Sequence, residues 1–132
     1  MLRSKLDLAK IKPLDKATWA GAVDNLGGDV LSWLASTMQV GGALASIGLA
    51  ASHEFKTTVM PFILRGVSLL GIDSVNTPMG QRRQVWKRLG SDLKPRHFKE
   101  MATTVAFNDL PGVFDRLLKA KARGRTVVKI SA

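Results

Sequence analysis

The stretch that decides the fold opens with Trp-Ala-Gly-Ala-Val-Asp (residues 19–24) and closes with Ala-Leu-Ala-Ser-Ile-Gly (residues 43–48). Short apolar runs like these predict buried strands, and the first one stops at loop-forming residues that include Asn25 and Gly27. Between the runs, apolar residues recur at spacings of three and four, as on one face of a helix: Val30, Trp33, Leu34, Thr37 and Met38. Gly41 and Gly42 are expected to end that helix.

The same alternation continues beyond residue 48. Residues 59–66 predict a short helix in which Pro61 suits the first turn and Gly66 suits the end, and residues 67–72 predict a third strand. Three apolar strands separated by helices indicate an α/β fold with a parallel sheet and helices on its faces. Ligands of such sheets bind outside the carboxyl ends of the strands, here at Asp24-Asn25, Gly48-Leu49-Ala50 and Asp73-Ser74.

The last third has a different character. Residues 81–93 predict a basic amphipathic helix, and residues 103–107 predict a strand whose end leads through Asn108 or Asp109 into another helix. That helix is expected to run from Leu110 to a stop at Gly124, and residues 126–130 predict a final strand.

Composition excludes several classes of protein. The chain has 132 residues and no cysteine, so disulfides, thiolate metal sites and cysteine nucleophiles are ruled out. This absence gives weak support for a reducing compartment, and we expect a cytoplasmic protein. Residues 30–52 carry no charge, but polar side chains and Gly41-Gly42 divide them, so we expect no membrane span. The net charge is +10, of which residues 80–132 hold +9, with thirteen basic and four acidic groups.

The motifs of a complete active site are missing. The chain has no G-x-G-x-x-G turn to hold a pyrophosphate, no H-E-x-x-H zinc motif, no G-x-S-x-G elbow and no tyrosine. We therefore predict no metal site and no catalytic residue on this chain.

Several features have an ordinary structural interpretation beside the functional one. Gly48 is compatible either with a turn or with contact to a cofactor, and Asp73-Ser74 is a common way to enter a loop. The cluster Arg82–Arg88 is more typical of a solvated helix face than of a nucleic-acid site, because no aromatic residue is interleaved on its wet side.

With the strand ends in place, the sequence resembles the acrylyl-CoA reductase family (AcuI- and YhdH-like proteins) of the medium-chain dehydrogenases/reductases. The most specific matches are Thr-Thr-Val-Met-Pro-Phe-Ile-Leu-Arg (57–65) and Gly-Ile-Asp-Ser-Val (71–75). Further matches lie at residues 19–24, 48–50 and 124–129, in the family's order.

The resemblance implies a zinc-independent reductase that uses NADPH to reduce an activated carbon–carbon double bond in an acyl-CoA or quinone-like substrate. Residues 1–102 would form the second half of a Rossmann-type sheet, and residues 103–132 would return to complete a GroES-like catalytic domain. Carried over position by position, the residues along the cofactor would be Gly48, Leu49, Ala50, Ile63, Asp73, Ser74 and Arg125. The GroES-like N-terminal domain, the glycine-rich turn and the residues that select the 2′-phosphate have no counterpart here.

Three hypotheses follow. The first is the C-terminal part of an NADPH-dependent oxidoreductase, inactive alone. The second is a small basic protein that binds nucleic acid or another polyanion, and the third is a structural remnant without a ligand. A sheet with an unpaired edge is liable to self-association, so we also expect a homo-oligomer.

Overall fold

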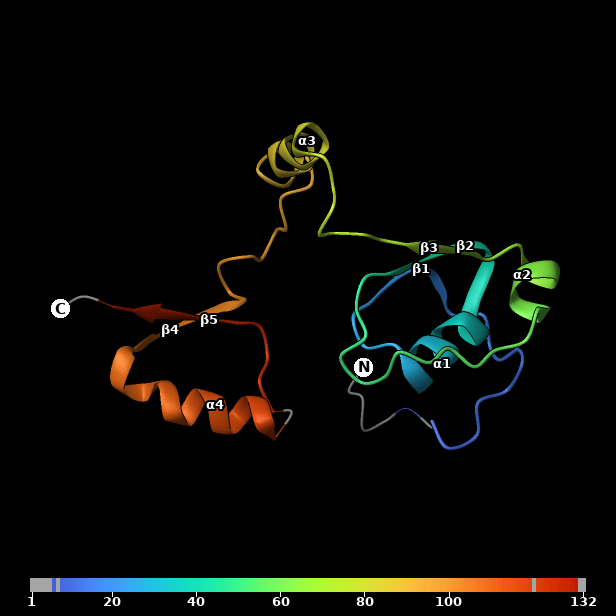
Figure 1. The fold of residues 1–132 in the computed structure, drawn as a ribbon, viewed down its shortest axis with the longest axis horizontal. Helices are drawn as coiled ribbons and strands as arrows, with labels where there is room; N and C mark the ends of the chain where they lie inside the picture. Colours follow the sequence, from blue (N-terminus) through green and yellow to red (C-terminus); the bar gives the residue numbers. More distant parts are fainter. Residues whose placement is uncertain (1–5, 7, 120, 131–132) are drawn as a thin grey trace. The chain divides into compact units, whose positions relative to one another are not determined.

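Three parallel strands form the sheet of the first unit: β1 (Trp19–Asp24), β2 (Met38–Ser46) and β3 (Ser68–Gly71), in the order β1-β2-β3. The computed structural model describes residues 6, 8–119 and 121–130, and its chain divides into two units, 1–77 and 78–132. Helix α1 (Gly28–Thr37) lies against the sheet, and α2 (Met60–Arg65) precedes β3 (Figure 1). The predicted parallel α/β fold is confirmed for this unit.

The core of this unit is small. Leu31 and Ala35 of α1 pack on Leu44 of β2, with Ala22 and Phe55 partly buried against them. The predicted face is only partly the buried one: Val30 and Trp33 are half-buried, whereas Leu34 packs against the core and Thr37 and Met38 are buried.

Helix α1 also ends earlier than predicted. It stops at Thr37, and β2 begins at once with the buried Met38, so Gly41 and Gly42 lie inside the strand. Gly41 has a φ of +72°, next to an irregularity in the pairing of β1 with β2. The carbonyls at this end are bound from outside the helix: the Arg65 guanidinium donates to those of Ser36 and Met38, both at 2.9 Å, and the Thr18 N–H donates to that of Thr37 at 2.8 Å.

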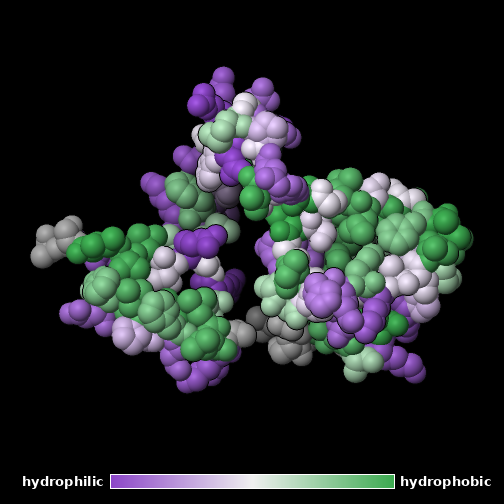
Figure 2. Space-filling model, in the orientation of Figure 1, coloured by the Kyte–Doolittle hydropathy of each residue, from purple (hydrophilic) through white to green (hydrophobic). Residues whose placement is uncertain are grey.

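The second unit contains α3 (Met79–Leu89), β4 (Ala102–Ala106), a 3₁₀ turn η2 (Phe107–Asp109), α4 (Leu110–Leu118) and β5 (Arg125–Lys129). Strands β4 and β5 pair in parallel, from Ala102 opposite Arg125 to Ala106 opposite Lys129. Figure 1 shows α4 running alongside these two strands. Val113 is the buried apolar residue of α4, and Figure 2 shows apolar side chains gathered over the α4 region.

Two boundaries in the second unit differ from the prediction. Helix α3 starts and ends earlier than residues 81–93, and it closes at Gly90, whose N–H donates to the Trp86 carbonyl at 3.0 Å. Helix α4 ends at Leu118, so Gly124 is not its stop. Gly124 has a φ of +75° just before β5, where a Cβ would collide with the Met101 carbonyl oxygen.

Within the described part of the chain, no helix is both long and apolar enough to cross a membrane. The predicted domain boundary near residue 102 is untested and stays a prediction.

Candidate functional site

The carboxyl ends of the three strands meet at one edge of the sheet. Asp24 of β1 stands opposite Ser46 of β2, and Ser46 stands opposite Gly71 of β3. The loops that follow these residues therefore leave the sheet side by side, as the parallel arrangement predicts. This edge is the candidate functional site.

Backbone hydrogen bonds join the loop after β2 to the loop after β1. Ile47 N–H donates to the Asp24 carbonyl at 2.9 Å, and Ala50 N–H donates to the Asn25 carbonyl at 3.2 Å. The N–H groups of Ala51 and Ser52 both donate to the Leu26 carbonyl, at 2.9 and 3.1 Å. Four backbone bonds thus fasten residues 47–52 to residues 24–26.

Two glycines permit this close approach. A Cβ on Gly48 would lie 2.7 Å from the Asn25 carbonyl oxygen and 3.1 Å from the Asn25 Cα. Gly27 has a φ of +69°, and a Cβ there would collide with the carbonyl oxygen of Ser52. Loop packing alone is therefore enough to require glycine at position 48, which is the structural interpretation left open by the sequence.

Asp24 sets the geometry of the turn into α1. Its side chain is 2% exposed, and its two carboxylate oxygens accept the N–H groups of Leu26 at 3.2 Å and Gly27 at 2.8 Å. A carboxylate with these partners is satisfied although it is buried. The negative charge also lies close to the start of α1, where the helix dipole favours it.

A hollow of about 250 Å³ opens at this edge. Its wall is formed by residues from both loops and from α1: Gly27, Leu31, Ser46, Ile47, Gly48, Leu49, Ser52, His53 and Glu54. Leu49 is 66% exposed. Complete small-molecule sites usually measure ~300–1,000 Å³, so this hollow has the size of part of a site. Sequence reasoning missed His53 and Glu54, because neither belongs to a recognisable motif.

The loop after β3 is closed by its own aspartate. The Asp73 carboxylate accepts the N–H groups of Val75 and Asn76, at 3.1 and 3.0 Å, and the Asn76 side-chain amide at 2.7 Å. The Asn76 amide is the main reason that the pKa of Asp73 lies below its ordinary value. Ser74 follows in the same turn, where its N–H donates to the Ile72 carbonyl at 3.1 Å.

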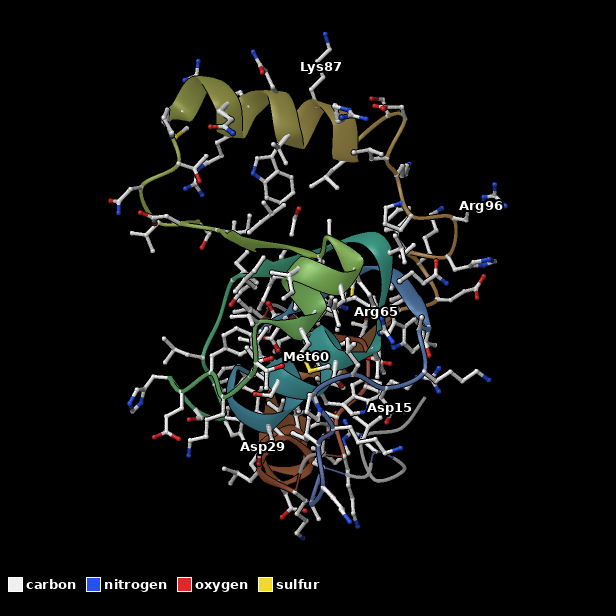
Figure 3. The ribbon with its side chains drawn as sticks, turned by 90° about the vertical axis from the view of Figure 1, so that its right-hand side faces the viewer. Asp15, Asp29, Met60, Arg65, Lys87 and Arg96 are labelled. Atoms are coloured by element: carbon white, nitrogen blue, oxygen red, sulfur yellow. The ribbon has the colours of Figure 1, made fainter. Side chains whose placement is uncertain are left out.

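Ile63 is 70% exposed on α2. Two residues further along, the Arg65 guanidinium binds the carbonyl of Met38, the first residue of β2, so the end of α2 lies at the amino-terminal end of the strand. Arg65 also binds the carbonyl of Asp15, and Figure 3 shows these two residues close together. The sequence placed Arg65 in a family motif without predicting this structural role.

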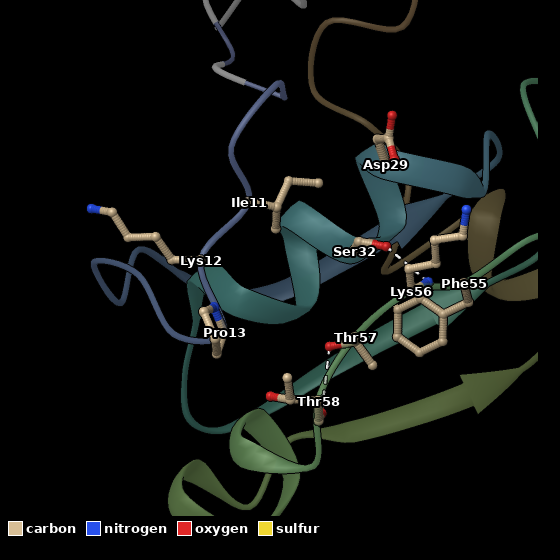
Figure 4. A pocket seen from close by; sticks show the side chains of 9 residues that line it. All are labelled: Ile11, Lys12, Pro13, Asp29, Ser32, Phe55, Lys56, Thr57 and Thr58. Carbon is tan, nitrogen blue, oxygen red and sulfur yellow. Dashed lines mark hydrogen bonds between the residues drawn. The ribbon is translucent and has the colours of Figure 1, made fainter.

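A larger hollow, of about 460 Å³, runs along α1 beside the segment that carries the Thr-Thr motif (Figure 4). Ser32 connects helix α1 to this segment, because its hydroxyl accepts a hydrogen bond from the Lys56 N–H at 3.2 Å and donates one to the Gly28 carbonyl at 3.1 Å. The lysines at its rim are engaged in ion pairs, Lys12 with Asp15 and Lys56 with Glu54. It therefore offers no free charge to a ligand at these two positions.

Arg125 begins β5 in the second unit, and its N–H donates to the Met101 carbonyl at 2.6 Å. Its approach to a cofactor stays a prediction, as do the cofactor contacts of the other six residues. Among residues 6, 8–119 and 121–130, no group of three or more His, Cys, Asp or Glu side chains is arranged to hold a metal ion.

Comparison with known proteins gives strong matches over nearly the whole chain. The sequence is 40% identical over 125 residues to the probable acrylyl-CoA reductase AcuI of Escherichia coli (strain K12), which covers 95% of this chain and 39% of that protein. It is 46% identical over 121 residues to the putative quinone oxidoreductase YhfP of Bacillus subtilis (strain 168), covering 91% of this chain and 37% of YhfP.

The fold matches as well. The structure superposes on E. coli K-12 YhdH with bound NADPH at a TM-score of 0.79 and 41% identity, covering 95% of this chain and 39% of YhdH. It superposes on YhfP with NAD bound at a TM-score of 0.76 and 46% identity, covering 92% of this chain and 37% of YhfP. No family model matches the chain. The chain thus spans less than two fifths of the length of the curated relatives described here.

Proposed function

We propose, from the confirmed resemblance of this chain to part of the acrylyl-CoA reductase family, that it supplies the nicotinamide side of an NADPH site. The activity in question is hydride transfer to an activated carbon–carbon double bond, and the chain is inactive without the polypeptide that completes the site. The observation that carries this proposal is the aligned carboxyl edge of the sheet, at Asp24, Ser46 and Gly71, in a chain with relatives solved with NADPH or NAD bound.

The chemistry of the hollow fits one half of the cofactor. Its wall combines two glycines and the apolar Leu31, Ile47 and Leu49 with the polar Ser46, Ser52, His53 and Glu54, a mixture that suits the uncharged nicotinamide ring and its polar ribose. The sequence has no G-x-G-x-x-G turn for a pyrophosphate, so in this proposal the phosphates require another part of the protein. In this proposal Gly48, Leu49 and Ala50 form the wall beside the ring.

The other predicted residues belong to the same proposal. Ile63 and the Asp73-Ser74 turn would face the cofactor, and Arg125 would approach it from β5. Residues 1–102 would belong to the nucleotide-binding domain and residues 103–132 to the catalytic domain. NADPH supplies the hydride when it is bound, and the residues of this chain orient the ring and keep water from one side of it.

The substrate class in this proposal is an acyl-CoA or a quinone-like molecule, the classes named for the relatives AcuI and YhfP. The excess of arginine and lysine after residue 80 suits the phosphates of coenzyme A, to which such side chains form charge-assisted hydrogen bonds. A cytoplasmic location and a homo-oligomer belong to the same proposal. The nucleic-acid hypothesis gains no support from these relatives.

The test is complementation. The chain is mixed with the part of E. coli AcuI that it does not match, and NADPH binding and acrylyl-CoA-dependent NADPH oxidation are measured for each part and for the mixture. We expect activity in the mixture and none from this chain alone. A Leu49→Glu variant should weaken NADPH binding about tenfold or more, because it places a carboxylate beside the ring and the cofactor phosphates.

Val40→Glu is the matched control, since Val40 is 80% exposed near the amino-terminal end of β2. It should leave the affinity within about twofold, the effect usual for a surface change remote from a site. A mixture that forms a complex without binding NADPH, or equal losses in the two variants, would contradict the proposal.

A further inference from the structure

Asp24 is a buried carboxylate at the point where β1 ends, and it binds the backbone that follows. One carboxylate oxygen accepts the Leu26 N–H at 3.2 Å, and the other accepts the Gly27 N–H at 2.8 Å. The residue is only 2% exposed, so a ligand at the edge of the sheet would have no access to it. Any effect of Asp24 on such a ligand must therefore pass through other residues.

The two peptide units that donate to Asp24 also accept hydrogen bonds from the loop after β2. The Asn25 carbonyl shares one planar peptide unit with the Leu26 N–H, and the Leu26 carbonyl shares the next unit with the Gly27 N–H. Together the two carbonyls accept three N–H groups from residues 50–52, at distances of 2.9 to 3.2 Å. Each unit is thus bound by the carboxylate through its N–H and by the loop through its C=O.

This arrangement couples the carboxylate to the loop. The N–H and C=O of a trans peptide unit point in opposite directions, so Asp24 and residues 50–52 lie on opposite sides of the same two units. A bond to the N–H also polarises the unit and strengthens the bond that its C=O accepts. Without the carboxylate, both units could turn about their flanking bonds, and the three bonds to the loop would lose their alignment.

A favourable charge at the start of α1 does not by itself account for Asp24. Asp29 already lies in the first turn of α1, where it is exposed, so the helix dipole has a negative charge without a buried one. Burial is costly for a carboxylate, and the two N–H groups offset that cost. Asparagine, of similar size, would present an NH2 donor where one of these N–H groups needs an acceptor. The geometry of the two N–H groups is thus the property that requires aspartate.

We infer that Asp24 is the positioning residue of the candidate site. Through the peptide units of residues 25–27 it holds residues 50–52 in place, and with them the wall at Gly48 and Leu49. This inference rests on the proposed function for the identity of the ligand. The ordering of the loop by Asp24 is a property of this chain alone, so it can be measured separately.

Hydrogen exchange of the full chain, followed by NMR without nucleotide, measures the ordering of the loop. In Asp24→Asn the amides of residues 50–52 should exchange about tenfold or more faster, because bonds that depend on a charged acceptor are among the stronger ones. The amide of Leu44, in the core of the unit, reports the stability of the whole unit. A substitution that only lowered this overall stability would accelerate Leu44 at least as much as the loop.

Asp29→Asn is the matched control, since it removes a charge from the start of the same helix (Figure 4) without removing a bond to residues 25–27. Its loop amides should exchange within about twofold of the wild-type rate, the effect usual for an exposed charge. Should Asp24→Asn fail to fold, Asp24→Ser provides the second test, because a serine hydroxyl supports the same kind of turn with a single acceptor.

The second measurement uses the complex of this chain with the part of E. coli AcuI that it does not match. Asp24→Asn should weaken NADPH binding about tenfold, measured by NADPH fluorescence, because binding must then order the loop. At saturating NADPH, kcat for acrylyl-CoA-dependent oxidation should stay within about threefold, since Asp24 contacts none of the reacting groups. This division between affinity and turnover is expected of a positioning residue.

Loop amides that accelerate no more than Leu44 in Asp24→Asn would overturn the inference. Faster exchange of the loop with unchanged NADPH affinity would overturn it as well, because the loop would then be ordered to no effect on the cofactor. A wild-type complex that fails to bind NADPH, although its loop exchange depends on Asp24, would contradict the proposed function and support the role of Asp24 in ordering the loop.

Discussion

Replacing Gly48 with alanine tests whether the two loops of the candidate site are packed as closely as the structure indicates. The new Cβ would lie 2.7 Å from the Asn25 carbonyl oxygen and 3.1 Å from the Asn25 carbonyl carbon. Both neighbours are backbone atoms, which cannot turn aside as a flexible side chain can. The loops must separate, and the hydrogen bond from Ala50 N–H to the Asn25 carbonyl, now 3.2 Å, would lengthen.

The expected cost is about 1–3 kcal/mol, the usual range for adding a methyl group to a closely packed position. Gly71→Ala is the matched control, because no atom lies within 4 Å of its Cβ and its φ is not positive. Since alanine restricts the unfolded chain more than glycine does, the control should be neutral or more stable by up to about 1 kcal/mol.

Urea unfolding without any ligand gives the free energies of both variants, and the melting temperature should fall by about 3–5 °C for each kcal/mol lost, a value between those of smaller and larger domains. Equal unfolding midpoints for the two variants would refute the packing argument for Gly48. In that case a requirement for glycine at this position would have to come from a ligand.

Three further changes test other parts of the structure. Arg65→Met should lower the free energy of unfolding by about 1.5–3 kcal/mol, because the carbonyls that Arg65 binds lose a charged donor. Arg96→Met, on the surface, should leave the free energy of unfolding unchanged, and urea unfolding measures both variants. Asn76→Ala should raise the pKa of Asp73 toward its ordinary value in an NMR titration, and an unchanged pKa would contradict the assigned cause. In the wild type, the stability from this turn is present above the ordinary aspartate pKa and is lost as the pH falls through the lowered pKa of Asp73. Val23→Lys should reduce self-association in light scattering, since Val23 is 70% exposed on the edge strand β1; equal scattering from both proteins would exclude this edge as the contact.

The sequence predicted β1 and β3 better than the end of α1 and the start of β2, which lies at Met38 and not at Ala43. Residues 19–24 and 67–72 are bounded by loop residues, so local composition was enough to place β1 and β3 within two residues. The carbonyls at the end of α1 are bound by residues distant in the sequence, among them Arg65, which is 28 residues beyond Thr37. A contact at that separation leaves no local signal, and the Gly41-Gly42 pair supplied a misleading one.

The candidate site was predictable as a place but not as a set of contacts. The parallel arrangement alone indicated that Asp24, Gly48 and Asp73 would follow neighbouring strand ends. That the Asp73 carboxylate is occupied by its own turn depends on Asn76, and that Gly48 meets Asn25 depends on the path of two loops. Neither relation follows from the spacing of residues along the chain.

The four backbone bonds between residues 47–52 and residues 24–26 have a thermodynamic consequence for any ligand at this edge. Both loops already hold one conformation, so binding beside Leu49 would not have to freeze a mobile backbone. That ordering would otherwise cost about 1–2 kcal/mol for each residue fixed. Affinity at this edge should therefore be limited by the contacts that the remaining polypeptide adds, with the wall described here serving as a preorganised template.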